Sequence, residues 1–202
     1  MVRKGLLIVV SGPSGSGKST LLKEIRKSNS DLKFSVSATT RVPRVNEVEG
    51  RNYFFKTVDE FKKMINNNEL IEWTQYCENF YGTPKKYVEN CIESGSDVIL
   101  EIEVVGNENI RKIYPECVSI FILPPTYKEL KRRIEVRGTE TGETKKRRLE
   151  TARKEMHCID QYNYVVLNDD INKAIFDIEC IINAEKLRVQ RNMNILNDIG
   201  LI

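Results

Sequence analysis

The sequence is poor in metal-binding and disulfide-forming residues. Its 202 residues include one histidine, His157, and five widely spread cysteines, with no pair in a CxxC arrangement. Zinc sites and disulfide frameworks need such residues at close, regular spacing, so the sequence argues against both. We expect free thiols in a reducing cytoplasm, where a free cysteine behaves as a small hydrophobic residue; the cysteines are Cys77, Cys91, Cys117, Cys158 and Cys180.

Long hydrophobic runs and an excess of charge of one sign are also lacking. The apolar run LLIVV at residues 6–10 is too short for the core of a signal peptide and far too short to cross a bilayer. Thirty-two basic and 29 acidic side chains leave a net charge of +3, which is too small to require nucleic acid or an anionic membrane as a partner. We therefore expect a cytoplasmic protein that binds neither nucleic acid nor membrane.

What the sequence does contain is an alternation of short apolar runs with amphipathic stretches. Buried strands are predicted at GLLIVV, SDVILEI, CVSIFIL and YVVLND. Capping residues precede predicted helices, namely Thr57 with Glu60, Thr126 with Glu129, and Asp170. The alternation predicts an α/β fold in which a parallel sheet is flanked by helices on both sides.

Two stretches depart from this alternation within what we expect to be a single folded unit. Residues 34–90 contain short β-like pieces and predict a small mixed-β insertion, mostly antiparallel. Residues 137–157 are highly charged and have few apolar side chains, so they are expected to bury little and to form a mobile helical lid. The predicted core comprises the remaining segments, 1–33, 91–136 and 158–202.

The segment SGPSGSGKST at residues 11–20 matches the phosphate-loop pattern GxxxxGK[ST]. Its glycines allow backbone N–H groups to point at phosphate oxygens, and the following helix adds the partial positive charge of its N-terminus. Lys18 is expected to reach the outer phosphates, and the Ser19 hydroxyl to hold Mg²⁺. A glycine-rich turn without function is the alternative, but the apolar strand before the segment and the amphipathic helix after it favour the phosphate loop.

A second anion site is predicted around Pro43, where Arg41 and Arg44 stand three residues apart. The planar guanidinium group binds phosphate through two parallel hydrogen bonds, a geometry that lysine cannot reproduce. Solvated loop charges are the alternative for such a pair, and the phosphate loop upstream favours binding. Hydroxyl-bearing and acidic side chains surround the two arginines: Ser37, Thr39, Thr40, Glu47 and Tyr53.

Four blocks of the sequence together resemble guanylate kinase. They are SGPSGSGKSTLL, FSVSATTRVPRVNEVEGRNYFF, LIEWTQYCENFYGT and RGTETGETKKRRL, and the resemblance extends to about residue 183. It implies a P-loop core with a GMP-binding insertion and a lid. It also implies transfer of the γ-phosphoryl group of ATP to GMP, which gives ADP and GDP.

The resemblance assigns a GMP site to the insertion. Its phosphate is expected on Arg41, Arg44 and the phenol groups of Tyr53 and Tyr81. Glu72 is the expected base reader, because a carboxylate accepts from both the N1–H and the 2-amino group of guanine, and adenine has neither donor. Family members carry hydroxyl residues that contact the base, most often with serine at the position of Thr83. The expected GMP-binding residues are Ser37, Arg41, Arg44, Glu47, Tyr53, Glu72, Tyr81, Thr83, Glu101 and Glu103.

The ATP side is expected to neutralise charge rather than to move protons. The phosphate of GMP has a second pKa of about 6, so it is mostly ionised at neutral pH and needs no general base. Lys18, Arg137 and Arg148 are the expected catalytic groups. Asn168 matches a family residue near the adenine, although a turn or cap role is equally open. The expected ATP-binding residues are Gly12, Pro13, Ser14, Gly15, Ser16, Gly17, Lys18, Ser19, Thr20, Arg133 and Asn168.

An acidic pair, Glu101 and Glu103, follows the apolar run of SDVILEI. The period of two along a strand puts both on one face at the carboxyl end of a parallel strand, where open sheets bind ligands, and they are candidates to hold waters of Mg²⁺. Family members commonly have Asp second and Gln two residues beyond it, so Glu103 and Val105 are departures. Trp73, the only tryptophan, is expected to pack in the core rather than against a base.

Two other functions remain open from the sequence. Guanylate-kinase-like domains also serve as protein-binding modules in scaffolds, but those typically lose the phosphate-loop and GMP residues that are present here. A kinase of another phosphorylated small molecule, such as a ribose bisphosphate kinase, is the second alternative, and Glu72 with Ser37 favours guanine over it. Whether the protein is a monomer or a homodimer, and whether it accepts dGMP, stays open.

Overall fold

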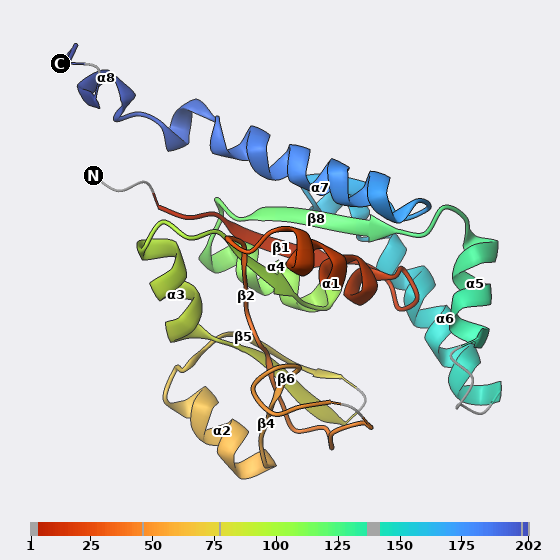
Figure 1. Cartoon of the computed structure of the whole chain (residues 1–202). Helices are drawn as coiled ribbons and strands as arrows, with labels where there is room; N and C mark the ends of the chain where they lie inside the picture. The colour runs from red at the N-terminus through yellow and green to blue at the C-terminus, as the bar shows by residue number, and fades with distance from the viewer. Residues whose placement is uncertain (1–3, 46, 77, 137–141, 199, 202) are drawn as a thin grey trace.

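The computed structural model describes residues 4–45, 47–76, 78–136, 142–198 and 200–201. Its strands form a five-stranded sheet of order β2-β7-β1-β8-β9 and a four-stranded sheet of order β4-β3-β6-β5 (Figure 1). The strands are β1 (Leu7–Ser11), β2 (Lys33–Phe34), β3 (Ala38–Thr39), β4 (Phe54–Phe55), β5 (Leu70–Tyr76), β6 (Asn79–Pro84), β7 (Val98–Glu101), β8 (Val118–Leu123) and β9 (Tyr164–Leu167).

Helices connect these strands and cover the larger sheet on both sides. They are α1 (Lys18–Ser28), α2 (Val58–Asn66), α3 (Lys85–Glu93), α4 (Val104–Ile113), α5 (Tyr127–Val136), α6 (Gly142–Met156), α7 (Ile171–Lys186) and α8 (Ile195–Asp198), with 3-10 turns at η1 (Ile159–Gln161) and η2 (Val189–Arg191). None of the helices in the described ranges is long and apolar enough to cross a membrane.

The larger sheet is parallel in all its pairings, as the alternating sequence predicted. Because side chains alternate along a strand, β1 supplies Ile8 and Val10 to the core beneath α1 and α7, and Leu7 and Val9 to the core beneath α3 and α4. Both faces of the strand are therefore buried, which explains why GLLIVV is continuously apolar. The central position of β1 places the loop that follows it in the middle of the carboxyl edge.

The smaller sheet corresponds to the predicted mixed-β insertion. β6 pairs antiparallel with β3 and β5, whereas β3 and β4 are parallel. Helix α2 packs Phe61 against Phe80 of β6, with ring centroids 5.5 Å apart. The stretch FSVSAT is divided between the sheets, since Phe34 pairs with Ile99 of the larger sheet and Ala38 opens the smaller one.

Two predicted helix caps are confirmed. The Thr57 hydroxyl accepts from the Glu60 N–H while the Glu60 carboxylate accepts from the Thr57 N–H, a complete capping box. The Asp170 side chain accepts from the Lys173 N–H at 2.8 Å and begins α7. The Thr126 hydroxyl likewise accepts from the Glu129 N–H at 3.1 Å, but the Glu129 carboxylate binds Arg132 and Arg133 instead of completing a box.

The expectation that residues 137–157 bury little holds for most of the described part of α6, with one small apolar cluster as the exception. Ala152 is fully buried, and Leu149 and Met156 pack with it against Leu130 and Ile134 of α5. The three apolar residues of α6 recur at spacings of three and four, so a helix gathers them on one face despite the charged composition. This small cluster fixes α6 beside α5, next to the loop that follows β1 (Figure 1).

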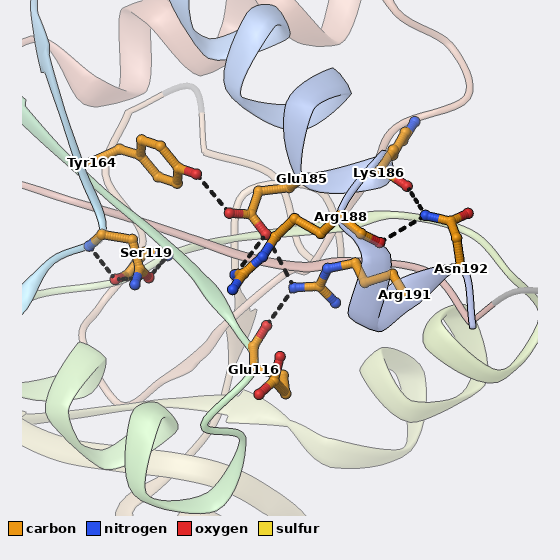
Figure 2. Close-up of polar contacts among 9 residues, drawn as sticks. Glu116, Ser119, Tyr164, Glu185, Lys186, Arg188, Arg191 and Asn192 are labelled. Atoms are coloured by element: carbon orange, nitrogen blue, oxygen red, sulfur yellow. Dashed lines mark hydrogen bonds and ion pairs between the residues drawn. The ribbon is translucent and has the colours of Figure 1, made fainter.

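The chain beyond α7 is tied to the core by one buried carboxylate. Glu185, which is 3% exposed, accepts from the Tyr164 hydroxyl at 2.6 Å and pairs with Arg188 and Arg191 (Figure 2). Arg191 also donates to the carbonyl oxygen of Glu116 at 2.8 Å. The network anchors the segment after α7 to β9 and to the loop before β8.

Candidate active site

The predicted phosphate loop joins β1 to the first turn of α1. Gly12 and Gly17 have φ angles of 152° and 88°, and no side chain fits at either position. A Cβ atom on Gly12 would lie 2.3 Å from the carbonyl oxygen of Ile122, and one on Gly17 would lie 2.3 Å from Nδ2 of Asn168. The loop therefore lies flat against β8 and the end of β9, with its N–H groups at the start of a helix, an arrangement that attracts anions.

Side chains from the opposite end of the sequence hold this loop. Asn168 is buried, and its amide donates to the carbonyl oxygen of Ser16 at 2.8 Å. Arg133 donates to the same Ser16 oxygen at 3.2 Å and to the Asn168 carbonyl oxygen at 3.1 Å. Hydrogen bonds from Arg132 and Arg133 lower the pKa of Glu129 to about 2. Glu129 is therefore ionised at neutral pH, and its carboxylate orients the guanidinium group of Arg133. Asn168 and Arg133, both predicted to bind ATP, therefore hold the backbone of the phosphate loop in place.

The first residues of α1 face the end of the neighbouring strand β7. The Ser19 hydroxyl donates to Oε1 of Glu101 at 2.6 Å, although the two residues are 82 positions apart. The Lys18 ammonium donates to the carbonyl oxygen of Gly12 at 2.6 Å, so its side chain spans the loop. Among the other loop residues, Pro13 accepts from the Ser16 N–H at 3.0 Å and Thr20 is exposed on α1.

The prediction that Glu101 and Glu103 share one strand face is wrong. Strand β7 ends at Glu101, and Glu103 is the residue that precedes α4, with extended backbone angles. The Ile102 N–H still donates to the Val10 carbonyl oxygen at 3.3 Å, and beyond this bond the chain of β1 enters the phosphate loop. Both carboxylates nevertheless act on one neighbour, since each raises the pKa of Tyr53.

Arg41 is held in place by Glu47. One nitrogen of its guanidinium group donates to both carboxylate oxygens of Glu47, at 2.9 and 3.0 Å, and the other donates to the Val42 carbonyl oxygen at 2.8 Å. Glu47 also accepts from the backbone N–H of Arg44 at 2.7 Å. Glu47 therefore shapes the turn that carries both arginines, while the side chain of Arg44 extends into solvent.

Two tyrosines stand beside this arginine turn. The Tyr53 and Tyr81 rings lie 6.2 Å apart at their centroids, and the Arg41 guanidinium lies 5.4 Å from the Tyr53 centroid. Burial, with the charge of Glu101 adding to it, raises the pKa of Tyr53 to about 12. Tyr53 is therefore a hydroxyl donor at neutral pH, which suits contact with an anion. Ser37 stands immediately before β3, and its carbonyl oxygen accepts from the Phe54 N–H at 2.9 Å.

A buried carboxylate lies further along the same sheet. Glu72 of β5 faces Thr83 of β6 across the antiparallel pair, and the Thr83 hydroxyl donates to Oε1 of Glu72 at 2.8 Å. Glu72 is 6% exposed, and burial raises its pKa to about 7 against the opposing effect of the Thr83 hydrogen bond. Helix α4 closes the site, because a Cβ atom on Gly106 would lie 3.0 Å from Oε2 of Glu72. Glu72 is thus a desolvated carboxyl group with acceptor capacity beyond its hydrogen bond from Thr83.

The prediction for Trp73 is wrong. Its side chain is 43% exposed, and it touches the Phe80 ring at a centroid distance of 6.0 Å instead of packing in a core. Neighbours on a strand point to opposite faces, so Trp73 points away from the buried Glu72. Val105, the other departure noted in this region, is exposed on α4.

Helix α6 reaches the phosphate loop through Ser14. The Arg148 guanidinium donates to the Ser14 hydroxyl at 2.7 Å. Glu155, which the sequence analysis did not single out, accepts from the Ser14 N–H at 3.4 Å. A signal was available, because Arg148 and Glu155 are seven residues apart and therefore share one face of a helix. The third predicted catalytic group, Arg137, lies outside the described residues.

A phosphate loop at the carboxyl edge of a parallel sheet, faced by an arginine–tyrosine turn and a buried carboxylate, defines a phosphotransferase of the P-loop class. The geometry brings together Lys18, Ser19 and Glu101 on one side and Arg41, Tyr53 and Tyr81 on the other. The chain belongs to the guanylate kinase family: the family model described as guanylate kinase matches residues 4–185.

Individual relatives agree with this assignment. A guanylate kinase of Caldanaerobacter subterraneus subsp. tengcongensis is 49% identical over 96% of this chain and 94% of its own length. A guanylate kinase of Carboxydothermus hydrogenoformans is 46% identical over 100% of this chain and 99% of its own length, so it includes the segment after α7. The crystal structure of guanylate kinase from Anaplasma phagocytophilum superimposes with a TM-score of 0.83 at 31% identity, covering 99% of this chain and 97% of that one.

Proposed function

We propose that this protein transfers the γ-phosphoryl group of ATP to GMP, giving ADP and GDP. Membership of the guanylate kinase family supports the reaction. The observation that carries the choice of acceptor is the buried Glu72–Thr83 pair. A desolvated carboxylate matches the two adjacent donors of guanine, and a base without those donors leaves it unpaired.

The proposed chemistry consists of positioning and charge neutralisation. The phosphate oxygen of GMP is already ionised near neutral pH, so no protein base is needed. Lys18 and Arg148 supply positive charge at the transferring group, and Arg137 is proposed to join them. Asn168 and Arg133 keep the loop rigid through Ser16, so that its N–H groups are in place before ATP arrives.

Mg²⁺ is proposed to bind next to Ser19. The Ser19 hydroxyl and the Glu101 carboxylate meet at 2.6 Å and are oxygen donors of the kind that this ion prefers. Mg²⁺ is usually held by one or two protein groups together with substrate phosphates and water, and Glu103 is a candidate for a water-mediated contact. When bound, the ion neutralises developing phosphate charge.

The acceptor site is proposed to lie on the smaller sheet. Arg41, Arg44, Tyr53 and Tyr81 take the GMP phosphate, with Glu47 fixing the turn between the arginines. Glu72, Ser37 and Thr83 take the base. In this proposal residues 34–90 form the GMP-binding insertion, residues 137–157 form the lid, and the remainder forms the core.

The cellular location, the acceptance of dGMP and the oligomeric state are proposed on separate grounds. Four cysteines in the described ranges are free thiols, Cys91, Cys117, Cys158 and Cys180, which supports a reducing, cytoplasmic location. We also propose that the protein accepts dGMP and that it is a monomer or a homodimer.

A coupled assay for ADP release tests the reaction. GMP, AMP, UMP and ribose bisphosphate are each offered with ATP and Mg²⁺, and GMP is expected to give by far the largest kcat/KM. Turnover with ribose bisphosphate alone would show that the acceptor is this sugar phosphate and not GMP, while the assignment as a kinase would stand. No turnover with any acceptor, together with no ATP binding, would favour a protein-binding module.

Replacing Arg44 with methionine is expected to raise KM for GMP and to leave KM for ATP nearly unchanged. The loss of a charged hydrogen-bond donor to phosphate is worth about 1.5–3 kcal/mol, or roughly 10- to 150-fold in KM. Arg51→Met, an exposed arginine of the same segment, is the control for the change in net charge. A shift in the ATP constant alone would show that the two phosphate sites are reversed.

Replacing Arg148 with alanine is expected to lower kcat by about 10²- to 10³-fold, the usual cost of one donor to developing charge. The dissociation constant for GMP is expected to stay unchanged, because this side chain donates to Ser14 of the phosphate loop at 2.7 Å. Steady-state kinetics and calorimetric titration with GMP measure the two quantities, with the exposed neighbour Arg147→Ala as control. An equal loss of GMP affinity would place Arg148 in the acceptor pocket.

A further inference from the structure

Helix α6 contacts the phosphate loop with an anion as well as a cation. Arg148 bonds the hydroxyl of Ser14 at 2.7 Å, while the carboxylate of Glu155 accepts from the backbone N–H of the same residue at 3.4 Å. The buried Ala152 lies between them and packs this face of α6 against α5. Packing of α6 against α5 therefore fixes the helix backbone that carries Glu155.

The surroundings of Glu155 are those of a phosphate site. Burial and the nearby carboxylate of Glu103 raise the pKa of Glu155 to about 7, while Lys18 and the Ser14 N–H act in the opposite direction. Lys18 and the loop N–H groups are the groups that this fold directs at nucleotide phosphates. Glu155 thus places a carboxylate oxygen where the protein is built to receive an anion.

We propose that Glu155 competes with nucleotide phosphate at the phosphate loop, so that the phosphates of ATP must displace its carboxylate from the Ser14 N–H. One N–H group cannot serve a carboxylate and a phosphate equally well, and two anions beside Lys18 repel each other. Glu155 therefore weakens the binding of ATP, and of ADP by the same contact. Displacement also releases the contact through which Glu155 holds α6 on the Ser14 N–H. The inference rests on the proposed function, since it assumes that nucleotide phosphates enter this loop.

The test is Glu155→Gln at a pH well above the raised pKa of Glu155, where the substitution removes a charge but keeps the size of the side chain and an oxygen that can accept from Ser14. Calorimetric titrations with ATP and with inorganic pyrophosphate are expected to give dissociation constants about tenfold lower than in the wild type, a change of about 1.4 kcal/mol. Pyrophosphate has no base, so its dissociation constant reports on the phosphate loop without contributions from contacts to the base. The dissociation constant for GMP and the melting temperature are expected to stay unchanged, which distinguishes this role from a structural one.

Glu150→Gln is the matched control, because it makes the same change of charge at an exposed position of α6. The inference is overturned if Glu155→Gln leaves the affinity for ATP and pyrophosphate unchanged or weakens it. It is also overturned if Glu150→Gln tightens binding equally, because the effect would then be one of net charge. Failure of the wild-type protein to bind ATP would instead overturn the proposed function.

Discussion

Replacing Lys18 with alanine is expected to lower kcat by about 10²- to 10³-fold or more while the protein stays folded. Lys18 begins α1, and its ammonium group lies 2.6 Å from the Gly12 carbonyl oxygen, across the loop that receives the phosphates. A charge in that position stabilises the transferring phosphoryl group more than bound ATP, so its loss appears mainly in kcat. The loop itself is held by Asn168 and Arg133 through Ser16, and these contacts do not involve the lysine.

The measurement is steady-state kinetics with saturating GMP, together with thermal unfolding to confirm the fold. Lys23→Ala removes an exposed lysine from the same helix and is the control for net charge. A folded Lys18→Ala protein with a kcat close to that of the wild type would contradict the assignment of Lys18 to the reaction.

Replacing Glu72 with glutamine is expected to weaken GMP binding and to narrow the preference for GMP over AMP. The carboxylate is 6% exposed and accepts one hydrogen bond from Thr83, which leaves acceptor capacity for the two guanine donors. Glutamine keeps the size of the side chain but turns one acceptor into a donor, which then faces a donor of the base. An unmatched buried group of this kind costs about 1–3 kcal/mol.

The preference of the wild type for GMP over AMP is expected to exceed the cost of the Glu72→Gln substitution alone. A site built to hydrogen-bond its substrate rejects an analogue that lacks those groups by about 10⁴- to 10⁵-fold. The quantities to compare are kcat/KM for GMP and for AMP in the wild type and the variant. Glu69→Gln, at an exposed carboxylate just before the same strand, is the control. Full retention of the GMP preference would mean that another residue distinguishes guanine, while the kinase assignment would stand.

Much of the fold follows from short-range patterns in the sequence. The apolar runs around Ile8 and Ile120 form parallel strands that are buried on both faces, and Thr57 and Asp170 begin helices through hydrogen bonds to residues three positions away. These features depend on contacts within a few residues or on periodic burial, so the sequence alone contains their cause.

Predictions failed where a neighbouring element decided the outcome. Glu103 lies outside β7 because the partner strand β1 has already turned into the phosphate loop. Trp73 is exposed because its side chain points away from the buried Glu72 and meets the Phe80 ring instead of a core. The charged helix α6 acquires a buried face because α5 offers Leu130 and Ile134 to it. Strand β1 is distant in sequence from Glu103, and α5 is separated from α6, so composition and periodicity did not reveal these contacts.

The sequence by itself determined the family, the phosphate-loop motif and the residue types that suit a nucleotide, because these are properties of single positions and fixed spacings. Only the tertiary structure decided which of them meet. The contacts of Ser19 with Glu101, Asn168 with Ser16 and Glu155 with Ser14 join residues 82, 152 and 141 positions apart. A hydrogen bond forms only within about 3.5 Å and in a favourable direction, and such precision over long separations arises from packing of the whole sheet and its helices.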